Sequence, residues 1–93
     1  MPILTREDII KRAPANWTFD EHSNSIFREY ECSNFVAAVE FIRRIAPVAE
    51  MLDHHPDILL HSYKRVRVML TTHSAGGVTD RDIILASQID TLI

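Results

Sequence analysis

Apolar side chains recur at intervals of three and four residues in two parts of the chain. The longer stripe follows Asn34, a good N-cap residue, and its apolar positions are Phe35, Ala38, Ile42, Ile45, Ala49 and Leu52. The second stripe follows a Gly76-Gly77 turn and the capping-box pair Thr79 and Asp82, and it contains Ile83, Leu85, Ala86, Ile89, Leu92 and Ile93. The two stripes predict two amphipathic helices, each with one buried face.

Two prolines modify the longer stripe. Pro47 lies inside it, where a proline removes one backbone hydrogen bond and crowds the preceding turn, so a kink is predicted there. Pro56 disfavours helical angles at His55, and we therefore expect the helix to end near His54. Near the start of the chain, the pair Thr5 and Asp8 resembles another capping box and predicts a short helix over residues 5–12.

Alternation with a period of two predicts the strands. Trp17 and Phe19 alternate with polar residues and are expected to point into the core, and after a polar turn at 21–24 the segment 25–32 alternates again. Residues 58–73 are rich in β-branched and aromatic side chains around a polar centre at 63–65, which fits two more strands. In the last strand one face holds Val66, Val68, Leu70 and Thr72, and the other holds Arg67, Met69, Thr71 and His73.

The predicted order of elements is α-β-β-α-β-β-α. This order favours an α+β fold in which a four-stranded antiparallel sheet carries three helices on one face. With 93 residues the chain is long enough for a single domain over 1–93 and too short for two. Because so small a core leaves a monomer marginally stable, we expect a homo-oligomer.

Composition and charge exclude several classes of function. A net charge of -3 and a pI near 5.9 provide no basic field for phosphates, so direct binding to nucleic acid is not expected. No apolar run resembles a signal peptide or a membrane span, and the single Cys32 cannot form an internal disulfide. We therefore expect a cytoplasmic protein with no membrane partner.

Histidines are the residues most able to support chemistry. His54 and His55 are adjacent at the predicted helix end, between Asp53 and Asp57, and His73 stands near the end of the last strand. The unpaired carbonyls of a helix end and the neighbouring carboxylates favour a protonated imidazole. A side chain that ionises near neutral pH suits general-acid work such as the expulsion of hydroxide.

Simpler interpretations of the same residues stay open. Adjacent histidines can simply end a helix, and Asp82 can be a helix cap, a functional group or both. A zinc site is the other alternative, but neighbouring histidines point apart on regular elements and Cys32 is distant in sequence, so no metal is expected.

The spacing of these residues resembles a known pattern: an acidic residue, three spacers, His-His-Pro, then an aromatic residue, a histidine and an aspartate. The residues that match it are Glu50, His54, His55, Pro56, Tyr63, His73 and Asp82. On this pattern the chain resembles the pterin-4a-carbinolamine dehydratases over nearly its whole length. Two departures are Ile58, where the family often has a large aromatic residue, and Pro47 within the long helix.

The resemblance implies both an activity and a site. It implies dehydration of a 4a-hydroxytetrahydropterin, such as 4a-hydroxytetrahydrobiopterin, to the quinonoid dihydropterin and water, in the recycling of tetrahydrobiopterin without metal or cofactor. His54 and His73 would act as acid and base, and His55 would bind and polarise the substrate. The remaining pterin-binding residues would be Glu50, Pro56, Thr72, Ser74, Ala75 and Asp82.

The resemblance also implies alternatives for the partner and the substrate. Family members commonly form homodimers and homotetramers through helices and sheet edges. Animal members also serve as dimerisation cofactors of a homeodomain transcription factor, and some microbial relatives suggest a role in molybdopterin-related metabolism. The sequence leaves the physiological pterin open.

Overall fold

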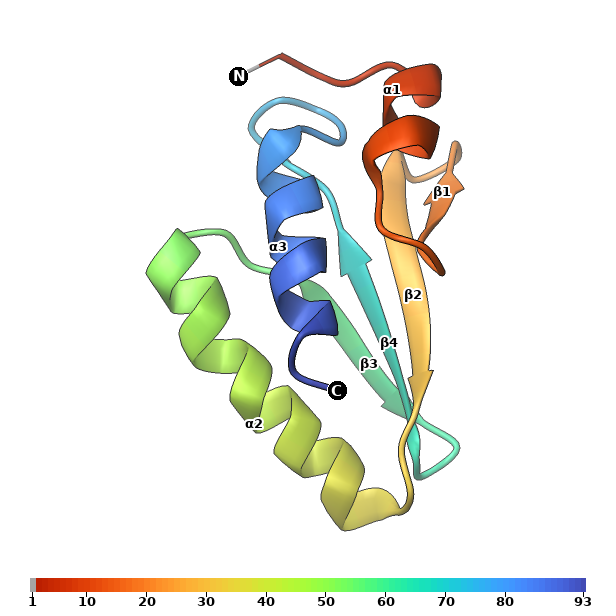
Figure 1. Ribbon diagram of the computed structural model, residues 1–93, viewed down its shortest axis with the longest axis vertical. Helices are drawn as coiled ribbons and strands as arrows, with labels where there is room; N and C mark the ends of the chain where they lie inside the picture. Colours follow the sequence, from red (N-terminus) through yellow and green to blue (C-terminus); the bar gives the residue numbers. More distant parts are fainter. Residues whose placement is uncertain (1) are drawn as a thin grey trace.

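The computed structural model describes residues 2–93, in which four strands form one antiparallel sheet. The elements in chain order are α1 (Arg6–Arg12), β1 (Thr18–Asp20), β2 (Ser25–Glu31), α2 (Phe35–Leu52), β3 (Asp57–His61), β4 (Arg65–Leu70) and α3 (Asp80–Asp90). The strand order is β1-β2-β4-β3, and every neighbouring pair is antiparallel. All three helices lie on one face of the sheet (Figure 1), so the α+β fold predicted from the sequence is confirmed.

The core fills the space between the helices and the inner face of the sheet. On β4 the alternation is as expected, because Val66, Val68 and Leu70 are buried while the side chains between them are half-buried on the outer face. Trp17 is also buried, although it lies one residue before β1, and Phe19 packs against the core from within that strand. The inner side chains contributed by the helices include Ile9, Ala38, Phe41, Ile45, Leu85, Ala86 and Ile89.

The long helix α2 follows the predicted apolar stripe, except that one predicted core residue is exposed and an unpredicted one is buried. Asn34 caps it, since its side-chain oxygen accepts a hydrogen bond from the Ala37 N–H at 2.8 Å. Phe41, which we did not predict, is buried, whereas Phe35 is 54% exposed and its assignment to the core was wrong. Phe35 is the first residue of α2, whose first turn extends past the ends of the strands (Figure 1) and therefore has no sheet to pack against.

The end of α2 differs from the prediction by two residues. The helix is continuous through Pro47, which is exposed, and the bend that we expect there stays a prediction. It ends at Leu52 because Asp53 adopts the left-handed conformation (φ 49°, ψ 44°), a common way to terminate a helix. His54 and His55 therefore lie beyond the last turn, in the extended segment that leads to β3.

The last helix begins with the predicted capping box. The Thr79 hydroxyl accepts from the backbone of the first turn, and the Asp82 carboxylate accepts from the Thr79 N–H at 2.9 Å. The helix ends at Asp90, so Ile93 lies outside it and is 65% exposed, contrary to our assignment of Ile93 to the buried stripe. None of the helices in residues 2–93 has the length and apolar content needed to cross a membrane.

A carboxylate at the end of α3 ties this helix to the sheet. Asp90 accepts hydrogen bonds from the Trp17 indole N–H at 3.1 Å, from the Arg28 guanidinium at 2.9 Å and from the Tyr30 hydroxyl. Burial, reinforced by the bond to Asp90, raises the pKa of Tyr30 well above its ordinary value, so this phenol remains a donor. The contact fixes the lower part of α3 against β2.

Candidate active site

One pocket lies where the end of α2, the end of β4 and the start of α3 come together. It has a volume of about 230 Å³ and is lined by Asp53, His54, His55, Thr71, Thr72, His73, Ser74 and Arg81. The three candidate histidines, which come from two segments separated by 18 positions in the sequence, therefore share one cavity.

His54 forms the buried wall of this pocket. The left-handed turn at Asp53 reverses the chain, so the His54 N–H donates to the Ala49 carbonyl at 3.1 Å and its ring turns inward. Its Nε2 lies 2.5 Å from Asp82 Oδ1. An ionised carboxylate only accepts hydrogen bonds, so Nε2 carries the hydrogen in this contact. Nδ1 makes no hydrogen bond to any residue within 2–93.

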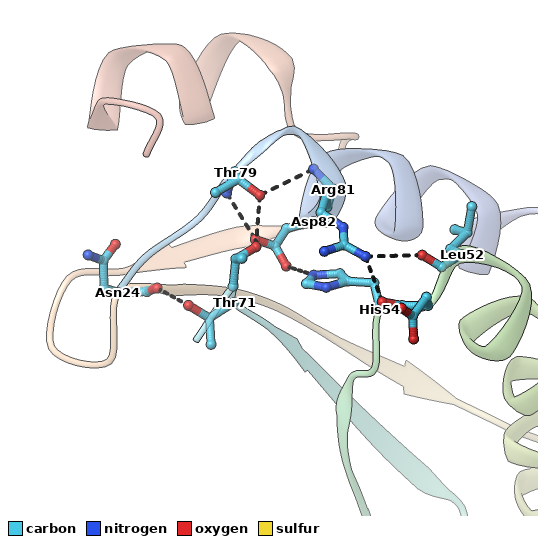
Figure 2. Close-up of polar contacts among 9 residues, drawn as sticks. Asn24, Leu52, His54, Thr71, Thr79, Arg81 and Asp82 are labelled. Atoms are coloured by element: carbon cyan, nitrogen blue, oxygen red, sulfur yellow. Dashed lines mark hydrogen bonds and ion pairs between the residues drawn. The ribbon is translucent and has the colours of Figure 1, made fainter. Parts of the chain in front are cut away.

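Asp82 is completely buried behind His54, and the polar groups around it satisfy both of its oxygens. Oδ2 accepts from the Thr72 hydroxyl at 2.8 Å and from the Thr79 N–H at 2.9 Å, while Oδ1 faces His54 (Figure 2). A buried carboxylate requires such compensation, because its desolvation is otherwise very costly. The same aspartate thus caps α3 and contacts the His54 ring, so the capping interpretation is confirmed and the functional one stays a prediction.

The other two histidines that line the pocket are exposed. His55 is exposed, and its Nε2 pairs with the Glu50 carboxylate. His73 begins the short loop between β4 and α3, which closes through Gly76 at a φ of 82°. A Thr72–Gly77 bridge holds the base of this loop.

The pocket contains some of the expected binding residues and excludes others. Thr72 and Ser74 line it, whereas Glu50 reaches it only through His55 and Asp82 only through His54. Pro56 and Ala75 are half-buried beside the pocket and do not line it. The resemblance implied that all four residues bind the pterin, and this stays a prediction.

Two positions of the sequence pattern belong to other parts of the fold. Tyr63 lies in the β3–β4 turn, which is at the opposite end of this hairpin from the pocket, and this residue is 61% exposed. Ile58 packs against the hydrophobic core from the inner face of β3.

Three lining residues were missed from the sequence: Asp53, Thr71 and Arg81. Thr71 stands two residues before His73 on the same face of the chain, so strand alternation could have identified it. Arg81 follows Asp80 in the first turn of α3 and precedes the recognised Asp82. Only its contacts with the end of α2, described below, show that it belongs to the pocket.

In the part of the chain that the structure describes, two other cavities are larger, but no histidine lines either of them. A cavity of about 400 Å³ between the end of β2, α2 and the C-terminal residues contains Cys32, and burial raises the pKa of this thiol and disfavours its reactive thiolate. Another, of about 550 Å³, lies along α2 near Pro47. Within residues 2–93 no group of three or more His, Cys, Asp or Glu side chains is arranged to hold a metal ion.

The fold and the pocket together define a class: a small α+β protein in which three histidines line one pocket and a buried carboxylate contacts one of them. The chain belongs to the pterin 4 alpha carbinolamine dehydratase family, whose model matches residues 2–92. This result confirms the resemblance inferred from the sequence pattern.

Relatives of known name agree with this membership. A protein of Chloroflexus aurantiacus is 40% identical over 93 residues, which cover 100% of this chain and 99% of the relative, and one of Metallosphaera sedula is 39% identical over 94 residues, with coverage of 99% and 95%. Both are named, provisionally, as pterin-4-alpha-carbinolamine dehydratases.

Solved structures show the same architecture. The crystal structure of a transcriptional coactivator/pterin dehydratase from Brucella melitensis has a TM-score of 0.89 and 34% identity, and the match covers 98% of each chain. A pterin dehydratase-like protein described as a RuBisCO assembly factor of the alpha-carboxysome matches with a TM-score of 0.69 and 17% identity, covering 83% of this chain and 88% of that one. At this identity the second match shows the fold alone.

Proposed function

We propose that this protein dehydrates a 4a-hydroxytetrahydropterin to the quinonoid dihydropterin and water. The observation that carries the proposal is that His54, His55 and His73 line one pocket in a member of this family. The pocket offers proton donors and acceptors on several sides, which is what an elimination of water requires.

The reaction needs two proton transfers and no redox partner. The C4a–O bond breaks, and the departing hydroxyl takes a proton from a general acid and leaves as water. The N5–H proton passes to a general base, and the electron pair of that bond forms the new double bond between N5 and C4a. In the proposal His54 and His73 exchange these two protons, and His55 binds and polarises the substrate.

Supporting contacts suit these roles. Asp82 holds the His54 ring through Nε2, which leaves Nδ1 as the nitrogen that exchanges a proton with the ligand. The buried carboxylate also stabilises the imidazolium that forms when His54 accepts a proton. Glu50 plays a comparable part for His55 at the exposed rim, where solvent screening weakens the pair.

The decisive experiment compares alanine variants of histidines inside and outside the pocket. We expect His54→Ala and His73→Ala to lose at least about a hundredfold in turnover, because one positioned acid or base contributes about 10²- to 10⁴-fold. The assay follows the absorbance of the quinonoid dihydropterin above the spontaneous dehydration. His61→Ala is the matched control, since His61 pairs with Glu29 outside the pocket. Unchanged turnover in both folded pocket variants would refute the assignment.

The identity of the pterin is a separate part of the proposal. We propose 4a-hydroxytetrahydrobiopterin as substrate, within tetrahydrobiopterin recycling in the cytoplasm, and a pterin of molybdopterin metabolism as the alternative. Because the proposed chemistry involves only the ring atoms C4a and N5, the side chain at C6 is the feature that distinguishes them. Parallel assays with pterins that differ only at C6 would identify the better substrate from kcat/KM.

A second candidate function is protein binding, and one observation favours it. The outer surface of α2 exposes large apolar side chains, among them Val36 at 75% and Met51 at 83%. A contiguous exposed apolar patch is typical of an interface, and Phe35, Val36 and Val39 expose neighbouring apolar side chains at the start of α2. We propose that α2 contributes to a homodimer or homotetramer, and a transcription-factor partner is the alternative occupant. Light scattering that finds only monomer at micromolar concentrations would contradict self-association.

A further inference from the structure

The end of α2 is held by a side chain from another helix. The last carbonyls of a helix have no partner within the helix, and they must find one elsewhere. Arg81 Nη2 donates to the Leu52 carbonyl at 3.2 Å and to the Asp53 carbonyl at 2.6 Å. The guanidinium therefore fixes the two residues that immediately precede His54 (Figure 2).

Arg81 and its neighbour Asp82 act on the same short segment. Asp82 holds the His54 ring, while Arg81 holds the backbone from which that ring projects. Both residues lie in the first turn of α3, whose start is fixed by the Thr79 cap. The first turn of α3 thus positions both the His54 ring and the backbone that precedes it.

We infer that Arg81 is a positioning residue for the proposed dehydration: it fixes the backbone at Leu52 and Asp53, and so the position from which the His54 side chain reaches Asp82 and the pocket. This inference rests on the proposed function. Its basis is geometric: the N–H groups of the left-handed turn at Asp53 and His54 donate back to α2, and Arg81 is the side chain that holds the Leu52 and Asp53 carbonyls from α3. Without the guanidinium, the His54 ring would sample positions that break its contact with Asp82.

Two variants of Arg81 test this role. Arg81→Met keeps the aliphatic stem but removes all donors, whereas Arg81→Lys keeps the charge with a single ammonium that cannot reproduce the planar guanidinium. A loss of about 10- to 100-fold in kcat is expected for Arg81→Met, since small misplacements of a reacting group cost rates of this order. The expected change in KM is less than about threefold, and Arg81→Lys should recover part of kcat.

A readout independent of activity accompanies the kinetics. The ¹⁵N NMR signals of the His54 ring in the ligand-free protein report which nitrogen carries the hydrogen. In the wild type we expect the Nε2–H tautomer, and in Arg81→Met we expect signals that move toward a tautomer average. Arg12→Met is the control, because Arg12 forms an ion pair with Asp80 in the same turn of α3. This variant should retain both kcat and the His54 signals.

The outcomes separate this inference from the proposed function. Wild-type kcat and unchanged His54 signals in folded Arg81→Met would overturn the inference. A rise in KM with unchanged kcat would also overturn it and would make Arg81 a binding residue. If Arg81→Met does not fold, Arg81→Lys decides by the same criteria. A wild-type protein without dehydratase activity would remove the proposed function, while the NMR comparison would still decide whether Arg81 positions His54.

Discussion

Replacement of Asp82 by asparagine tests the chemical role of the buried carboxylate with little change of shape. One side-chain oxygen remains and can still accept from the Thr79 N–H and the Thr72 hydroxyl, as Oδ2 now does. The new amide NH₂ then faces His54 Nε2. Because this amide nitrogen only donates, Nε2 must become the acceptor, and the hydrogen of the ring moves to Nδ1.

The structure allows the cost of this change to be estimated. Asp82→Asn loses a charge near the start of α3 and a charge-assisted hydrogen bond, so the free energy of unfolding should fall by about 1 to 2 kcal/mol. Asp82→Ala leaves the buried N–H groups of His54 and Thr79 without acceptors, at about 1 to 3 kcal/mol each, or roughly 2 to 6 kcal/mol in total. Typical domains have only about 5 to 15 kcal/mol of stability, so asparagine is the informative variant.

Turnover should respond far more strongly than stability. With the wrong tautomer His54 cannot exchange a proton through Nδ1, and we expect Asp82→Asn to lose about 10²- to 10⁴-fold in kcat. The assay combines quinonoid dihydropterin formation, urea unfolding and ¹⁵N NMR of the His54 ring. Full kcat in a variant whose NMR signals show the changed tautomer would refute two roles: that Asp82 fixes the tautomer of His54, and that Nδ1 exchanges the proton.

Three further predictions concern the stability of the fold. Asp90→Ala should lower the free energy of unfolding by about 1 to 3 kcal/mol because buried donors lose their acceptor, and urea unfolding followed by Trp17 fluorescence measures this. Gly76→Ala should cost about 1 kcal/mol because Gly76 has a φ of 82°, and thermal unfolding would detect it. The hydrogen bond from His61 lowers the pKa of Glu29 below its ordinary 4.5. Glu29→Gln should therefore destabilise the protein above pH 4.5, and this destabilisation should disappear as the pH falls through the lowered pKa. Urea unfolding midpoints measured against pH test the sign.

Much of the fold could be predicted because local rules and the core agree. Asn34 and Thr79 start their helices as their capping patterns predict, and β4 alternates as expected. The errors lie at element ends. Phe35 and Ile93 are apolar and fit the helical period, but the first turn of α2 has no sheet to pack against and α3 ends three residues before Ile93. Periodicity carries no information about where an element or its neighbouring layer ends.

The candidate site was less accessible to sequence reasoning. The motif brought the three histidines together correctly, but it did not separate side chains that line the pocket from those that support them. Asp82, which the resemblance implied as a pterin-binding residue, is buried behind His54 and contacts its ring. Arg81 was overlooked, since its role depends on backbone carbonyls at the end of a distant helix, and backbone carbonyls have no signature in a sequence.

The pocket is assembled from the ends of elements, while the hydrophobic core lies between their middles. A substitution in the loop at 73–75 can therefore reshape the mouth of the cavity without repacking a single buried side chain. Selection can tune the preferred ligand and the stability of this scaffold as nearly independent traits. The exception is the turn at 79–82, where the same carboxylate caps the start of α3 and contacts His54. A substitution there would affect both stability and the pocket.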